Sequence, residues 1–216
     1  VAAAQKFVSE DIGVPALTAG PSEILVVADK NSNPEWVASD LIGQAEHDNL
    51  AQCILISKDK SLLNKVNTEI LKQLKELPRS SVARKSLIDN GILIYVNSDT
   101  QIIKTVNKIA PEHLELNIKN YKKIVSKIKN SGSICLGKYA VMAMTDYNVG
   151  SNHVLPTNGS ARYSSGISVN EFYKRISYIN LTKKGIENLG SSVITLANYE
   201  GLVGHALSVK KRIGRK

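Results

Sequence analysis

Short runs of consecutive apolar residues alternate with amphipathic helical patterns over the first two thirds of this 216-residue chain. Five such runs are rich in Ile, Val and Leu and predict strands at residues 23–28, 52–57, 92–96, 114–118 and 133–136. Strands that are apolar without interruption are typical of sheets covered on both faces. We therefore predict an α/β fold, with a mostly parallel sheet and helices on both faces, as an incomplete Rossmann-like domain.

Helical patterns fill the intervals between the predicted strands. Asn33 and Pro34 provide an N-cap and a proline at the first helical position, and this helix reaches Gln44 and His47. A second pattern continues from residue 62 to 74 until Pro78 ends it. Further helices are predicted at residues 102–109 and 124–128.

The composition changes after the fifth predicted strand. Residues 139–166 are rich in Gly, Ser, Asn and Thr and predict a long loop, and loops of this length are commonly functional. Residues 169–212 predict two or three helices, separated near residues 181–182 and near Gly190. We predict an α/β domain over residues 1–158 and a C-terminal helical extension over residues 159–216 that contacts a second subunit.

Cellular location and partners follow from composition. No apolar run is long enough to span a bilayer and no signal peptide opens the chain, so we expect a cytoplasmic protein without a membrane partner. Cys53 and Cys135 lie in apolar runs and predict buried free thiols in a reducing compartment.

The net charge of +9 raises the alternative of a nucleic-acid binder. However, the lysines are spread along predicted helix surfaces, and only residues 210–216 form a dense basic run. Aromatic residues make up 5% of the chain and do not alternate with basic ones, so we predict no nucleic-acid partner.

Each of the four histidines stands near other polar groups. Gln44 and His47 are three residues apart on a predicted helix, where an amide oxygen and an imidazole can share a metal ion or simply form a solvated face. Glu112 and His113 follow Pro111 between a helix and a strand. A carboxylate beside an imidazole can divide proton-transfer work, although an exposed loop pair is the alternative.

Asp146 and His153 belong to the long polar loop, where each can be a ligand, a substrate contact or part of a turn. Glu200 and His205 are five residues apart, which is about 140° around a helix. One straight helix therefore does not direct both at a single ion, and different roles or different subunits are favoured. The glycine spacing of a dinucleotide or phosphate loop is missing from the chain.

The order of several motifs resembles the histidinol dehydrogenase family, in register from about Ala19 to Arg212. The motifs are Ala19-Gly20-Pro21-Ser22-Glu23-Ile24-Leu25-Val26, Ala38-Ser39-Asp40-Leu41 with Gln44-Ala45-Glu46-His47, Pro111-Glu112-His113-Leu114, Asp146-Tyr147 through Gly150, Asn152-His153-Val154-Leu155-Pro156-Thr157, and Glu200-Gly201-Leu202 with His205.

This resemblance implies a zinc-assisted, NAD-dependent oxidation of L-histidinol, through histidinal, to L-histidine. It implies one zinc ion per subunit of a homodimer, with His205 donated across the interface, and acid/base roles for Glu112 and His113. The implied zinc ligands are Gln44, His47, Asp146 and His205. The implied substrate contacts are Ser22, Gln44, His47, His113, Asp146, His153, Glu200 and His205.

Members of that family are about twice as long, and their NAD contacts correspond to a half that this chain lacks. The segment at residues 140–145 also departs from the family, which usually has a Pro-Glu pair and later a Gly directly before the Asp. Two hypotheses remain: a zinc- and substrate-binding half of the enzyme, or a truncated, inactive homologue that binds metal or mediates dimerisation.

Overall fold

The computed structural model describes residues 4, 7–8 and 20–214, which include every predicted site residue. Its contacts divide the chain into two compact units, Val1–Phe172 and Tyr173–Lys216. Among the described residues, no helix has both the length and the apolar composition needed to cross a membrane.

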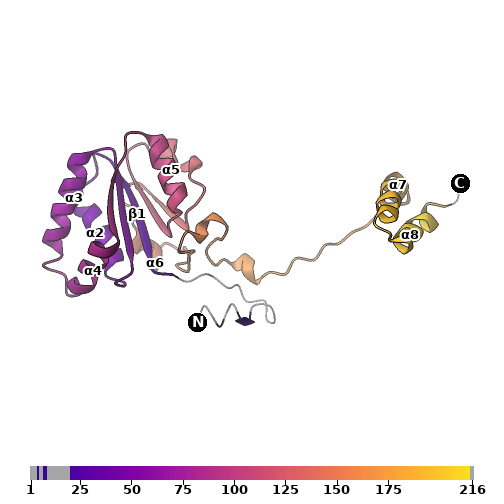
Figure 1. Ribbon diagram of the computed structural model, residues 1–216, viewed down its shortest axis with the longest axis horizontal. Helices are drawn as coiled ribbons and strands as arrows, with labels where there is room; N and C mark the ends of the chain where they lie inside the picture. The colour runs from indigo at the N-terminus through magenta and orange to yellow at the C-terminus, as the bar shows by residue number, and fades with distance from the viewer. Residues whose placement is uncertain (1–3, 5–6, 9–19, 215–216) are drawn as a thin grey trace. The chain divides into compact units, whose positions relative to one another are not determined.

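The first unit is built on a five-stranded sheet (Figure 1). Its strand order is β3-β2-β1-β4-β5, and every neighbouring pair is parallel, which confirms the predicted parallel sheet. Three strands have the predicted limits, and the other two begin and end one residue earlier than predicted. The strands are β1 (Glu23–Ala28), β2 (Gln52–Ser57), β3 (Gly91–Tyr95), β4 (His113–Asn117) and β5 (Ser133–Leu136).

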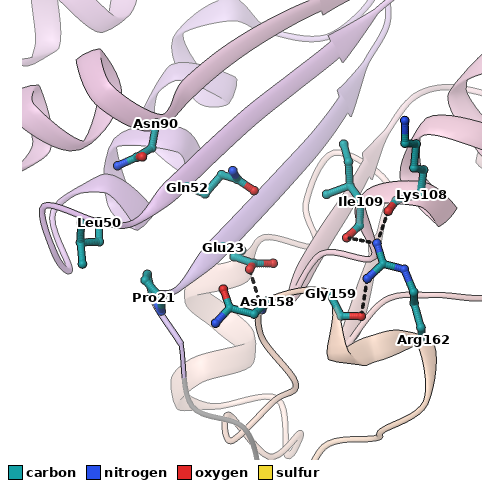
Figure 2. Close-up of a pocket in the computed structure, with 10 residues that line it drawn as sticks. All are labelled: Pro21, Glu23, Leu50, Gln52, Asn90, Lys108, Ile109, Asn158, Gly159 and Arg162. Carbon is teal, nitrogen blue, oxygen red and sulfur yellow. Dashed lines mark hydrogen bonds between the residues drawn. The ribbon is translucent and has the colours of Figure 1, made fainter.

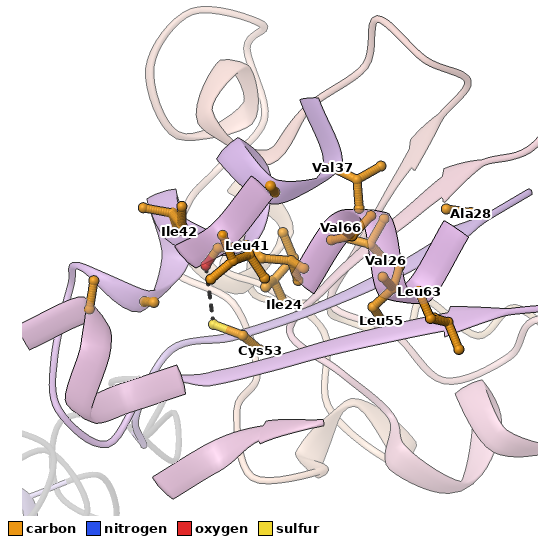
Figure 3. Close-up of a cluster of buried hydrophobic side chains, with 14 of the residues drawn as sticks. Ile24, Val26, Ala28, Val37, Leu41, Ile42, Cys53, Leu55, Leu63 and Val66 are labelled. Carbon is orange, nitrogen blue, oxygen red and sulfur yellow. Dashed lines mark hydrogen bonds between the residues drawn. The ribbon is translucent and has the colours of Figure 1, made fainter. Parts of the chain in front are cut away.

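Helices cover both faces of the sheet, as predicted (Figure 1). Helices α2 (Pro34–Ala45), α3 (Lys60–Gln73) and α4 (Ser80–Asn90) lie on one face, and α5 (Asp99–Ile109) lies on the other. Alternate residues of β1 and β2 enter the two cores, since successive strand side chains point to opposite faces. Figure 3 shows the core under α2, where the Cys53 thiol donates to the carbonyl of Leu41.

The start of α2 has the geometry that its sequence predicts. Asn33 has an extended backbone, its side chain accepts the Glu35 N–H, and Pro34 opens the helix. The helix ends at Ala45, so Gln44 belongs to its last turn and His47 lies beyond it. The prediction that Gln44 and His47 share one helical face is therefore wrong, because the chain leaves the helix before His47.

Two further helix predictions need correction. Residues 124–128 do not form an α-helix but contain one short 3₁₀ turn, η2 (Val125–Lys127), which follows another, η1 (Tyr121–Lys123). Helix α4 was not predicted, because it buries only small side chains, Ala83 and Ser86, and so carries little apolar periodicity. The Ser86 hydroxyl donates to the carbonyl of Ala51, which anchors this polar helix to the turn before β2.

The long polar segment is not wholly a loop. It contains a short helix, α6 (Met142–Tyr147), and a 3₁₀ turn, η3 (Ser160–Arg162). Helix α6 forms where the Met142 side chain enters the core beneath α2 and its N–H donates to Glu115. These are contacts between distant parts of the sequence, so local composition predicted a loop instead.

Another 3₁₀ turn, η4 (Val169–Phe172), ends the first unit. The second unit contains α7 (Lys183–Tyr199) and α8 (Val203–Ile213), which confirms the helical C-terminal end. The predicted break near Gly190 is wrong, because Gly190 lies inside α7. A Cβ atom there would lie 2.1 Å from Cδ1 of Ile213, so glycine permits the close approach of α8.

We expect the sheet to depend strongly on its fully buried leucines. Leu55→Ala removes a side chain with no solvent exposure, and the cavity should lower the free energy of unfolding by about 2–5 kcal/mol. Leu71→Ala in α3 is the matched control, because that side chain is half exposed and its loss should change stability by about 0.5 kcal/mol or less. Urea denaturation of the full chain measures both, and equal losses would contradict the assigned core.

Candidate functional site

A stripe of buried polar side chains marks the face of β4 that looks toward α2 and α6. Leu114 and Leu116 point to the opposite core, so the alternating positions His113, Glu115 and Asn117 point to this face. All three are at least nine-tenths buried. Buried polar and charged groups are costly unless they are satisfied, so such a stripe indicates a site.

Glu112 precedes this stripe and is held by Glu23, the first residue of β1. The Glu23 N–H donates to Oε2 of Glu112 at 2.9 Å, and the Glu112 N–H donates to Oε2 of Glu23 at 3.3 Å. The other oxygen of Glu23 accepts the N–H of Asn158 at 2.8 Å. These bonds fix one oxygen of Glu112 and leave Oε1 directed toward His113, 3.9 Å from its Nε2.

His113 links the acidic groups of the site. Its Nδ1 is 3.1 Å from the hydroxyl of Ser133, and its Nε2 is 3.9 Å from Oδ1 of Asp146. Asp146 comes from α6, and its side chain is 16% exposed. The structure therefore brings Asp146 to Glu112 and His113 from a position more than thirty residues further along the chain.

Burial and neighbouring charges shift the protonation of this pair in opposite directions. Burial lowers the pKa of His113 to about 4; Asp146 opposes this change, while His47 and His153 add to it. Burial raises the pKa of Glu112 to about 7, with Glu23 and Asp146 adding to the rise. At neutral pH the imidazole is therefore neutral, and the carboxyl group is poised to exchange a proton.

Gln44 carries a buried side-chain acceptor that is not hydrogen-bonded to any residue that the structure describes. Its side chain is 1% exposed, and Oε1 has no hydrogen-bond partner among the described residues. An unsatisfied buried acceptor costs about 1–3 kcal/mol, which a bound cation would offset. His47 is exposed just beyond the end of α2, and its charge acts on His113. The imidazole of His47 and the carboxylate of Asp146 are ligand types that zinc takes in proteins.

The remaining predicted residues are less buried than the carboxyl–imidazole pair. Ser22 is half-buried directly before β1, and His153 is exposed in the segment after α6. Glu200 caps the end of α7 and His205 lies in the first turn of α8, so they occupy different helices of the second unit and both are exposed. Within the described part of the chain, no group of three or more His, Cys, Asp and Glu side chains is arranged to hold a metal ion.

A cavity of about 420 Å³ lies on the other side of Glu23 (Figure 2). Arg162 closes one side, where its guanidinium donates to the carbonyl oxygens of Gly159, Lys108 and Ile109. The sequence did not predict Glu23, Asn158 or Arg162 as site residues. The Gly-Pro-Ser-Glu motif was the only signal for Glu23, and no local pattern marks the other two.

The site lies at the amino ends of the strands, since Glu23 and His113 begin β1 and β4. In open parallel sheets, ligands usually bind at the carboxyl ends, where the strand order reverses. Here that position is between β1 and β4, where Asp29, Ser32 and Asn117 are among the residues that line a cavity of about 320 Å³. Asp29 accepts the N–H groups of Asn31 and Lys119, and the Ser32 hydroxyl donates to the carbonyl of Asn117.

The sheet order and the acid–imidazole pair define a Rossmann-like α/β protein with an acid/base site at an unusual edge. The family model of histidinol dehydrogenase matches residues 1–213. The chain therefore belongs to the histidinol dehydrogenase family, as the motifs predicted.

Individual relatives agree with this assignment. The chain is 79% identical over 216 residues to a histidinol dehydrogenase of Pelagibacter ubique, covering 100% of this chain and 50% of the relative. It is 45% identical to that of Nitrosomonas europaea, covering 98% and 49%. A crystal structure of histidinol dehydrogenase from Elizabethkingia anophelis superimposes with a TM-score of 0.91 at 41% identity, covering 97% and 48%. The chain thus spans about half the length of these relatives.

The raised pKa of Glu112 predicts a pH-dependent stability. A group whose pKa rises on folding stabilises the protein below its unfolded value of 4.5, and this contribution is lost as pH rises through about 7. Glu112→Gln stays neutral, so in zinc-free protein its unfolding free energy relative to the parent should increase between pH 5 and 8, by on the order of 2 kcal/mol. Denaturant titration at each pH measures this difference.

Glu76→Gln, at an exposed position after α3, provides the control for removal of a carboxylate. Its stability relative to the parent should not change with pH in this range. A parallel response of the two variants would show that Glu112 ionises as an ordinary exposed acid.

Proposed function

We propose that this chain is the zinc- and substrate-binding half of a histidinol dehydrogenase. The assembled enzyme would be an oxidoreductase that oxidises L-histidinol, through histidinal, to L-histidine with NAD, in histidine biosynthesis. The observation that carries the proposal is the buried pair of a neutral His113 and a Glu112 with a pKa of about 7, in a chain 79% identical to a protein named histidinol dehydrogenase.

Two proton-transfer roles follow from the resemblance and suit the chemistry of this pair. His113 would accept the proton of the alcohol, since a neutral imidazole has a free nitrogen lone pair. Glu112 would activate water for the second oxidation, since a carboxyl group with a pKa of about 7 can both accept and release a proton near neutral pH. Glu23 supports this role because its N–H holds the second oxygen of Glu112.

The proposed zinc ligands are Gln44, His47, Asp146 and, from a second copy of the chain, His205. The unpartnered Oε1 of Gln44 supports this set, because it is a buried acceptor without a donor among the described residues. A zinc ion held by these residues would supply Lewis acidity and would help to hold the amine and imidazole of the substrate. Within the described residues of one copy, no group of three or more His, Cys, Asp and Glu side chains is arranged to hold a metal ion, and the proposed set also uses an amide and a histidine from a second copy.

Ser22, His153 and Glu200 are the further proposed substrate contacts, beside the metal ligands and His113. The NAD site is proposed to lie largely outside this chain. One observation supports that proposal: the chain spans about half the length of its relatives. A homodimer in the cytoplasm completes the proposal, without nucleic-acid or membrane partners.

Glu112→Gln tests the division of labour between the two oxidations. The chain should be assayed joined to the remaining half of the Pelagibacter ubique relative, with histidinol and with histidinal as separate substrates. Loss of general base catalysis should slow histidinal oxidation about 10²–10⁴-fold while NADH formation in the first oxidation falls much less. Glu76→Gln should retain both rates, and equal losses in both oxidations by Glu112→Gln would refute the assigned role.

The second candidate function is an inactive homologue that binds metal or mediates dimerisation. The altered residues 140–145 favour it. We expect one zinc per chain in the dimer, lost in His47→Ala and kept in His153→Ala, as measured by metal analysis after dialysis. Zinc binding without histidinol turnover in the joined protein would support this second function. If the joined protein neither bound zinc nor oxidised histidinol, only common descent from the family would remain supported.

A further inference from the structure

Glu115 is an almost fully buried acid that the proposed chemistry does not use. It lies in β4 two residues after His113, on the same face of the sheet, with 2% of its surface exposed. Burial raises its pKa to about 8, with Asp40 adding to the rise. Burial of an ionisable side chain lowers the stability of the fold unless its partners compensate. The hydrogen-bond partners of Glu115 therefore indicate its role.

One partner of Glu115 is the start of α6. The N–H of Met142, the first residue of that helix, donates to Oε1 of Glu115 at 2.7 Å. No side chain caps α6 locally within the described residues, so this distant carboxyl group serves the first turn. Asp146 follows Met142 by four residues, about one helical turn later. The position of Asp146 therefore depends on the bond between Met142 and Glu115.

The second partner of Glu115 is Asp40 in α2, with which its side chain forms a hydrogen bond. Asp40 precedes Gln44 by four residues, so the two side chains lie on one face of the helix. Oδ2 of Asp40 and Oε1 of Gln44 are the two buried side-chain atoms that lack a hydrogen-bond partner within the described chain.

We propose that Glu115 is a positioning residue that fixes α2 and α6 relative to each other, through Asp40 and the Met142 N–H, and thereby sets the spacing of Gln44 and Asp146. This inference rests on the proposed function, because it gives those two residues their shared role in binding zinc. Residues that orient metal ligands commonly change metal affinity 10–100-fold when replaced.

Glu115→Leu and Glu115→Gln separate positioning from simple burial. Leucine fills similar space in this buried region but removes both hydrogen bonds. Glutamine keeps an oxygen to accept the Met142 N–H and gains an amide that donates to Asp40. The full chain should be used for both variants, with thermal melting to confirm that each is folded.

The first measurement is amide hydrogen exchange without metal. In Glu115→Leu, exchange in residues 142–147 should accelerate at least tenfold, while α3, which does not contact Glu115, keeps the parent rates. Glu115→Gln should keep the parent rates in both segments. Unchanged exchange in residues 142–147 of Glu115→Leu, or equal acceleration in α3, would overturn the proposal, because the effect would then be absent or global.

The second measurement is zinc affinity by competition with a chelator. We expect the Kd to rise 10–100-fold in Glu115→Leu and to stay within about threefold of the parent in Glu115→Gln. Parent affinity in Glu115→Leu would also overturn the proposal. If the parent dimer binds no zinc, the proposed zinc site fails, whereas the exchange measurement still decides whether Glu115 positions α6.

Discussion

The need to satisfy buried polar groups on one face of β4 organises the site. Continuous apolar packing secures β1 and β2 on both faces, whereas β4 directs His113, Glu115 and Asn117 toward the side covered by α2 and α6. Each of these groups needs a partner in a region with little water. The Ser133 hydroxyl lies within hydrogen-bond distance of Nδ1 of His113, and the Met142 N–H donates to Glu115. The Ser32 hydroxyl donates to the backbone carbonyl of Asn117. The polar network therefore determines where the short helix α6 can form.

The two ends of the sheet have opposite properties. At the carboxyl ends, Asp29 accepts the Lys119 N–H and Ser32 donates to the carbonyl of Asn117, beside a cavity of about 320 Å³. At the amino ends, Glu112 and His113 keep oxygen and nitrogen atoms that face each other at 3.9 Å without a good hydrogen bond. The buried carboxyl–imidazole pair thus lies at the amino ends of the sheet, opposite the position where ligands usually bind in open parallel sheets.

Local patterns predicted the features that depend on neighbouring residues. The apolar runs gave all five strands to within one residue, and Asn33 with Pro34 marked the start of α2. The same reasoning failed where distant contacts decide. Helix α4 buries small residues against the turn before β2, α6 depends on Glu115, and Gly190 lies inside α7 because Ile213 packs against it.

The sequence by itself determined the parallel α/β fold and the family, because apolar periodicity and ordered motifs are properties of the linear chain. It also predicted Glu112, His113 and Asp146 as catalytic or ligand-binding residues. Only the tertiary structure decided that these three converge, that Glu23 holds Glu112, and that burial drives the pKa values of Glu112 and His113 in opposite directions. Convergence and burial depend on the path of the chain between distant residues, which no local pattern records.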